Sequence, residues 1–176
     1  MRKTKQVDVG GVKIGGGAPV AIQSMSTFSP VDTAFAAAQI NALGKAGADI
    51  VRVAVPDRRA AEALKDLKAL VSISLVADIH FDYRLAIRAA ENGAAKIRIN
   101  PGNIGGEDRV RAVVEKCRGA GVSIRIGVNG GSLERELWEK YGGPTAEAMV
   151  ESARRHIQLL EREHFYDYVL SLKHSN

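Results

Sequence analysis

Short apolar segments alternate along most of the chain with longer stretches of helical periodicity. The apolar segments have the length and residue types of β-strands. They occupy residues 20–25, 49–55, 74–79, 96–100, 123–129 and 166–173. Because helical stretches separate them, no two of these strands are close enough along the chain to form a hairpin. Strand–helix–strand units of this kind predict a parallel sheet.

Two parallel architectures fit this pattern: an open doubly wound sheet and a closed (β/α)8 barrel. The stretch "QSMSTFSP" after the first strand is not a Gly-x-Gly-x-x-Gly turn, and polar residues lie inside several strands, so the barrel is favoured. A complete barrel takes about 250 residues in eight units. We therefore predict an α/β protein with a partial TIM-type (β/α)8 barrel of about six βα units, truncated, forming a single domain over residues 1–176.

The opening "QVDVGGVKIGGG" has a different pattern. Val7 and Val9 alternate with polar residues, Gly10 and Gly11 suit a tight turn, and alternation then resumes. We predict a short β-hairpin that closes the bottom of the barrel. A plain surface hairpin would show the same pattern.

Basic residues fall at comparable places near the ends of four strands: Arg52, Arg98, Arg125 and Lys173. In a barrel, such residues point toward one axial pocket and repel one another unless an anion balances them. Arginine forks match phosphate oxygens, and the glycine-rich turns "NPGNIGG" and "NGGS" allow backbone N–H groups to approach the same anion. The pattern predicts a phosphate-binding site. The alternative is that each cation lies in water or pairs with a carboxylate.

The segment "LVADIHFD" places Asp78 and His80 on one face of an extended chain after the third strand. They could bind hydroxyl groups, relay a proton or ligate a metal, although no third ligand follows at helical spacing. An Asp–His hydrogen bond of structural origin is the alternative. We expect His156 and His164 to face solvent and Cys117 to pack within a helix interface.

The net charge of +5 suits an anionic partner, but the basic residues are scattered and only 5% of residues are aromatic. A small phosphorylated ligand therefore fits better than nucleic acid. One cysteine excludes a disulfide or a thiolate metal site within this chain. No apolar run reaches the length of a membrane span, and "MRKTKQVDV" lacks a signal-peptide core, so we expect a cytoplasmic protein without membrane contact.

Several segments together resemble one known family. The stretches "GAPVAIQSM", "LVADIHFDYRLA", "KIRINPGNIG" and "IRIGVNGGSLE" look like the N-terminal barrel of the 4-hydroxy-3-methylbut-2-enyl diphosphate synthase family. The resemblance extends from about residue 3 to residue 176 in order. It implies an oxidoreductase of the methylerythritol phosphate route to isoprenoids.

The resemblance implies a reductive ring opening of 2-C-methyl-D-erythritol 2,4-cyclodiphosphate to (E)-4-hydroxy-3-methylbut-2-enyl diphosphate. Electrons reach a [4Fe-4S] cluster from flavodoxin or ferredoxin. The four basic residues match the family's diphosphate-binding positions, and we expect Asn100 and Asn129 to join them. Asp78 and His80 match polar residues beside the substrate. We expect them to orient its hydroxyl groups rather than to serve as an essential acid.

Two barrel units and the cluster domain of the family have no counterpart in this chain, and Cys117 alone cannot hold a cluster. We therefore expect that this chain binds no cofactor, does not turn over substrate alone, and forms a homodimer through exposed barrel edges. Two alternatives are a cluster-independent phosphate-ester enzyme, such as a pterin-type synthase, and a nucleic-acid-binding module.

Overall fold

The computed structural model describes residues 3–100 and 103–176. Within these two ranges, eight strands and six α-helices follow one another, with a short 3-10 helix, η1, after the seventh strand. The strands are β1 (Val7–Val9), β2 (Val12–Ile14), β3 (Gln23–Met25), β4 (Ile50–Ala54), β5 (Ser74–Asp78), β6 (Lys96–Ile99), β7 (Ser123–Asn129) and β8 (Tyr168–Lys173). The helices are α1 (Thr33–Lys45), α2 (Arg58–Leu70), α3 (Tyr83–Glu91), α4 (Glu107–Ala120), η1 (Gly130–Ser132), α5 (Arg135–Tyr141) and α6 (Ala146–Arg162).

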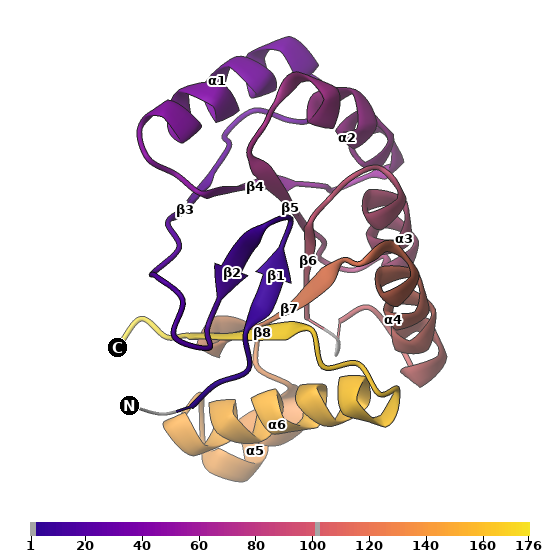
Figure 1. Cartoon of the computed structure of the whole chain (residues 1–176). Coiled ribbons are helices and arrows are strands. Elements are labelled where there is room, and N and C mark those ends of the chain that lie inside the picture. Colours follow the sequence, from indigo (N-terminus) through magenta and orange to yellow (C-terminus); the bar gives the residue numbers. More distant parts are fainter. Residues whose placement is uncertain (1–2, 101–102) are drawn as a thin grey trace.

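Strands β3 to β8 form one parallel sheet in which each strand lies beside its neighbour in the sequence. The sheet curls into a half-barrel, and the helices lie outside it in an arc (Figure 1). The prediction of a partial TIM-type barrel with about six units is confirmed. No helix of the described residues is long and apolar enough to cross a membrane.

Alternate residues of each strand face opposite sides of the sheet. In β4, Val51 and Val53 are fully buried in the large core beneath the helices, whereas Ile50 belongs to a smaller cluster inside the curl. Arg52 therefore points to the concave side, as Ile50 does. The apolar positions that alternate with arginine build the helix-facing core, and the arginines are left for the barrel interior.

Helix ends are fixed by residues that the sequence provides locally. The side chain of Asp57 accepts a hydrogen bond from the N–H of Ala60 at the start of α2, and Thr145 does the same for Ala148 at the start of α6. Helix α4 ends at Gly121, whose φ of 65° is a left-handed conformation that glycine adopts readily. The positions of these helix ends determine where the chain leaves each helix and returns to the sheet.

The hairpin β1–β2 packs against the amino ends of the strands, inside the arc of helices (Figure 1). Val9 is 0% exposed and clusters with Ile50 and Val76. The hydroxyl of Ser74 donates to the carbonyl of Gly10 at 3.0 Å. The predicted closure of the barrel bottom is confirmed, and the plain surface hairpin is not what the structure has.

Apolar side chains are exposed near both outer strands of the sheet. Ile22, just before β3, and Leu172 in β8 are more than one-third exposed. Each outer strand has a sheet neighbour on one side only among the described residues. The apolar surface that we expected at these edges is therefore exposed. The homodimer stays a prediction.

We expect Val9→Ala to lower the free energy of unfolding by about 1.5–3 kcal/mol, because it removes a fully buried side chain from the contact between hairpin and barrel. Val20→Ala is the matched control, since Val20 is 92% exposed and should change stability by less than about 0.5 kcal/mol. Denaturant unfolding of both variants measures the difference. Equal stabilities would mean that the hairpin is not part of the cooperative core.

Candidate functional site

The carboxyl ends of the six parallel strands surround a hollow of about 460 Å³, here called the basin. All four predicted basic residues line it, together with Asp78, His80 and Asn129. The register of the sheet explains this convergence, because Asp78 lies beside Arg98 and Arg98 lies beside Arg125 in adjacent strands.

Asp78 is the centre of the polar contacts in the basin. Its side chain is only 6% exposed. Nη1 of Arg98 donates to its Oδ1 at 3.0 Å, and Nε of Arg52 lies 3.6 Å from its Oδ2. The alternative interpretation is that a cation at a strand end pairs with a carboxylate. It therefore holds for two of the four basic residues, Arg52 and Arg98. Because both carboxylate oxygens face guanidinium groups, no Asp78–His80 hydrogen bond is seen among the described residues.

Arg125 lies on the other side of Arg98 and has no carboxylate at bonding distance among the described residues. Its Nη2 donates to the hydroxyl of Ser171 at 2.7 Å. Burial lowers the pKa of Arg125, and the positive charges of Arg52 and Arg98 lower it further, against the opposing effect of Asp78. The guanidinium is thus held in a place where positive charge is already in excess.

The described lining of the basin carries four cations and one carboxylate. Charge of one sign gathered in a concave site attracts small anions strongly. The arginine forks present paired N–H groups to oxyanions in a geometry that a single ammonium does not offer. The arrangement can bind a phosphate or diphosphate group.

Gly127 in β7 makes room for one of these forks. A Cβ at this position would lie 2.8 Å from Nε and 2.9 Å from Nη2 of Arg98. Only glycine leaves this approach open, so the guanidinium can lie against the backbone of the neighbouring strand. A glycine inside the strand pattern "SIRIGVN" is a signal of close backbone approach, but the pattern alone does not show which side chain approaches it.

The remaining predicted residues occupy less central places. His80 is exposed, two residues after β5, with its ring near that of Phe81. The side chain of Asn129 accepts a hydrogen bond from the N–H of Gly131 and caps η1. Asn100 is buried directly after β6, and its carbonyl accepts from Asn103.

The predicted contribution of the turn "NPGNIGG" falls partly on residues 101–102, which lie outside the described residues. The structure adds lining residues that the sequence pattern did not indicate. Besides Gly127, they are Gln23, Ser24, Met25, Val128 and Ser171.

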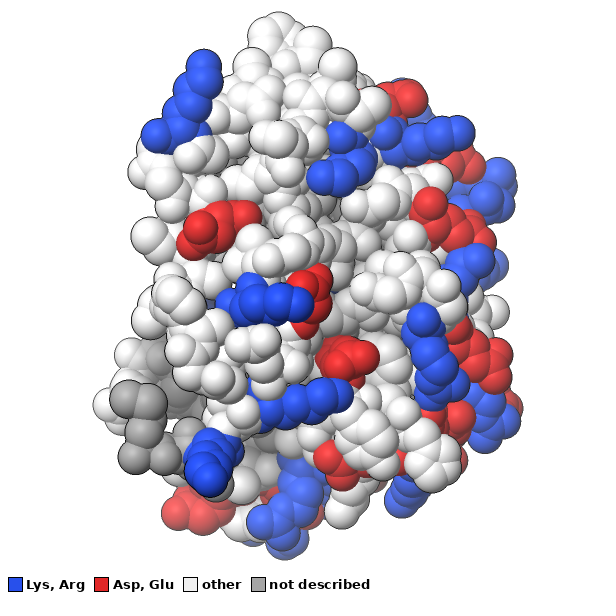
Figure 2. Space-filling view, viewed as in Figure 1, with Lys and Arg blue, Asp and Glu red and all other residues white. Residues whose placement is uncertain are grey.

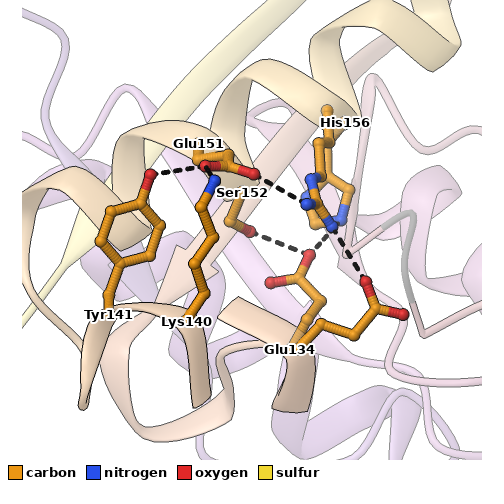
Figure 3. A network of polar contacts seen from close by, with 8 residues as sticks. Glu134, Lys140, Tyr141, Glu151, Ser152 and His156 are labelled. Atoms are coloured by element: carbon orange, nitrogen blue, oxygen red, sulfur yellow. Dashed lines mark hydrogen bonds and ion pairs between the residues drawn. The ribbon is translucent and has the colours of Figure 1, made fainter. Parts of the chain in front are cut away.

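The expectation that His156 faces solvent is wrong (Figure 3). It is 3% exposed, and its Nε2 lies 2.9 Å from Oε1 of Glu134, to which the hydroxyl of Ser152 also donates. Burial raises the pKa of Glu134, but the hydrogen bonds from His156 and Ser152 outweigh it and bring the pKa to about 2. The network joins the start of α5 to α6. His164 is exposed, as expected.

No group of three or more His, Cys, Asp or Glu side chains within the described ranges is arranged to hold a metal ion. Cys117 is fully buried in the core under the helices, as predicted. Burial raises the pKa of its thiol to about 12, and a single cysteine cannot supply the several thiolates that hold an iron–sulfur cluster. The residues described here do not fit an iron–sulfur cluster.

The described residues on the hairpin side of the surface form no corresponding basic patch (Figure 2). Figure 2 shows Lys and Arg interspersed with Asp and Glu over this face, with both signs along the helices. On this face no continuous positive track is available for a nucleic acid.

Comparison with known proteins agrees with this architecture. A family model described as the GcpE TIM-barrel domain matches residues 4–176. The chain is 58% identical over 175 residues to 4-hydroxy-3-methylbut-2-en-1-yl diphosphate synthase (flavodoxin) of Pseudomonas savastanoi pv. phaseolicola, covering 99% of this chain and 47% of that protein. Identity to the protein of the same name from Idiomarina loihiensis is 56%, with the same coverage. The chain thus spans about half the length of these relatives.

Solved structures at low identity share the fold. Dihydropteroate synthase of Yersinia pestis superposes with a TM-score of 0.62 at 15% identity, over 94% of this chain and 61% of that chain. A phospho-2-dehydro-3-deoxyheptonate aldolase of Thermotoga maritima gives the same TM-score and identity, over 96% and 45%. Such distant likeness shows the barrel architecture alone. The family model and the high identity over nearly the whole chain decide the family: this chain belongs to the GcpE TIM-barrel domain family.

Proposed function

We propose that this chain is the substrate-binding barrel of an enzyme that reductively opens 2-C-methyl-D-erythritol 2,4-cyclodiphosphate to (E)-4-hydroxy-3-methylbut-2-enyl diphosphate. The observation that carries the proposal is the convergence of four cations around one buried carboxylate in a single basin. The synthase name of relatives that are 58% and 56% identical supports the choice of substrate.

The basic residues have different roles in binding the cyclic diphosphate. Arg98 and Arg52, both fixed by Asp78, present oriented N–H groups, while Arg125 supplies positive charge that no carboxylate among the described residues offsets. Lys173 is exposed at the end of β8 and adds an ammonium group at the rim. Asn129 and Asn100 add amide groups for hydrogen bonds at the ends of β7 and β6.

Asp78 and His80 have different tasks in this proposal. Asp78 keeps two guanidinium groups in place and lowers their mutual repulsion, because both of its oxygens face them. His80 stands at the exposed rim of the basin and reaches a substrate hydroxyl from there. Neither residue needs to act as an essential acid.

The electrons for the reaction come from a [4Fe-4S] cluster in this proposal. Cys117 and the other described residues do not fit such a cluster, so it belongs to a part of the full-length protein outside residues 1–176. Flavodoxin, which the names of the relatives contain, is the proposed electron donor, with ferredoxin as the other candidate. We also propose a cytoplasmic location.

A cluster-independent enzyme remains the alternative. The solved dihydropteroate synthases share the fold at about 15% identity, and nothing in the basin favours a pterin over a cyclic diphosphate. Binding of the cyclic diphosphate itself decides between them.

We expect this chain to bind the cyclic diphosphate in calorimetry, and Arg98→Ala to weaken binding by about 1.5–3 kcal/mol, the value of a charge-assisted hydrogen bond. Arg58→Ala is the control, because Arg58 is exposed on α2, pairs with Glu62 and does not line the basin. Unchanged affinity for Arg98→Ala would rule out the proposed grip on the diphosphate. Stronger binding of DNA than of the cyclic diphosphate would favour the nucleic-acid module.

Gly127→Ala should also weaken binding, by about 1–3 kcal/mol, because the new methyl group displaces the guanidinium of Arg98. Gly119→Ala is the matched control, because Gly119 is exposed on α4, does not line the basin, and a Cβ there would meet no atom within 4 Å. Calorimetry compares the two variants. If they bind equally, the close approach of Arg98 to β7 has no part in ligand binding.

This chain alone should show no visible absorption band after anaerobic reconstitution with iron and sulfide, and no turnover with reduced flavodoxin. The reason is the absence, among the described residues, of a fitting set of ligands. The full-length relative from Pseudomonas savastanoi is the positive control. Turnover by residues 1–176 without iron would support the cluster-independent alternative instead.

A further inference from the structure

Lys96 is a cation buried inside the barrel that the proposed diphosphate grip does not use. It is 2% exposed, although lysine is rarely buried without a partner. It lies in β6 two residues before Arg98, so both side chains face the concave side of the sheet. Its neighbours in register are Val76 in β5 and Ser123 in β7. The side chain therefore starts one layer below the basin.

No carboxylate pairs with Lys96 among the described residues. The nearest acidic residue on the neighbouring strand β5 is Asp78, whose oxygens face Arg98 and Arg52. From β7, Arg125 repels the ammonium. At the outer strand β8, Lys173 adds another positive charge at the rim of the basin.

The hairpin below does not supply a counter-ion either. Its two charged strand residues, Asp8 and Lys13, are exposed and lie 2.6 Å apart in an ion pair of their own. Lys96 therefore has positive charges above it and an apolar cluster of Val9, Ile50 and Val76 beneath the basin. A buried charge in this setting is costly unless an anion comes near.

We propose that Lys96 is a proton-linked counter-ion of the basin: its amine takes up a proton from solvent when the doubly negative cyclic diphosphate binds above it, and its charge then holds the ligand more tightly. This inference rests on the proposed function, because it needs an anion in the basin. Lys96 acts through the low-dielectric interior and does not have to touch the ligand. No bond other than the N–H bond of the ammonium is formed.

The charge state of the unliganded protein agrees with this role. Burial, and secondarily Arg125, lowers the pKa of Lys96 from 10.5 to about 8. Near neutral pH the amine of Lys96 is therefore mostly protonated in the folded protein, but it binds this proton less tightly there than in the unfolded chain. The unfolded chain binds more protons between about pH 8 and pH 10.5, so the stability of the unliganded protein should rise with pH across that window.

A structural lysine and a counter-ion for a ligand make opposite predictions. If Lys96 serves the fold, Lys96→Met should destabilise the protein. If it serves the anion, Lys96→Met should stabilise the unliganded protein, remove the rise in stability above about pH 8, and weaken ligand binding. Gain of stability with loss of affinity is the expected signature of a residue kept for function.

The test is calorimetry of the full chain with 2-C-methyl-D-erythritol 2,4-cyclodiphosphate in buffers of different ionisation enthalpy, below and above about pH 8. Each phosphorus of this ligand carries one strongly acidic hydroxyl, so the ligand does not titrate in this range. At about pH 8 and above, where the unliganded amine is partly neutral, wild type should take up protons on binding, and its affinity should fall as pH rises. Lys96→Met should bind at least about fivefold more weakly below pH 8 and take up no proton.

Lys65→Met is the charge-matched control, because Lys65 is exposed on α2, and it should behave as wild type. Absence of proton uptake by wild type above about pH 8 overturns the inference, and this measurement does not depend on the folding of any variant. Wild-type affinity in Lys96→Met, or a loss of its stability in denaturant unfolding, also overturns it while the proposed function stands. If wild type does not bind the cyclic diphosphate at all, the proposed function falls as well.

Discussion

The ion pairs of Asp78 hold the candidate site together. Parallel strands in register bring arginines from β4, β6 and β7 to one end of the sheet, where their guanidinium groups would repel one another. One buried carboxylate at 3.0 Å from Arg98 and 3.6 Å from Arg52 makes that crowding tolerable. It does not neutralise the site. The basin keeps its surplus of positive charge because a single carboxylate serves several cations.

The rest of the fold supports this charge cluster from three sides. The helix-facing core, built on residues such as Val53, Ile97 and Ile126, fixes the strand spacing behind the arginines. The hairpin closes the opposite end and packs on Ile50 and Val76. Beyond β7, the contacts of Glu134 with His156 and Ser152 secure helices α5 and α6 to each other. The site is therefore carried by strands whose positions are fixed before any ligand arrives.

Much of this arrangement could be predicted from the sequence, since period-two alternation shows which strand residues share a face. The comparable places of Arg52, Arg98, Arg125 and Lys173 near the ends of four strands predict that they converge, and the alternation around Val7 and Val9 predicts the hairpin. What the sequence did not show depends on distances between strands. Whether Gly127 lies beneath the guanidinium of Arg98, or Ser171 beside Arg125, is set by register.

Burial was harder still to predict from local pattern. His156 lies in a helix rich in charged residues, and only its contact with Glu134 at the start of α5 makes its position interior. The pattern of "KIRIN" places Lys96 in a strand, but nothing in it distinguishes an exposed cation from one buried below a pocket. Both cases depend on elements that are distant in the chain.

The two outer strands have a consequence for symmetry. Because β3 and β8 belong to a wholly parallel sheet, a two-fold axis that pairs β8 with its own copy would set the two strands antiparallel. Such a pairing interrupts the barrel rather than continuing it. Head-to-tail addition of β3 onto β8 keeps the direction but brings more strands than the eight on which a TIM barrel closes. Closure of a ring on β8 would therefore need strands that differ from β3–β8 and run parallel to β8, so self-association of this chain is a separate matter from closure.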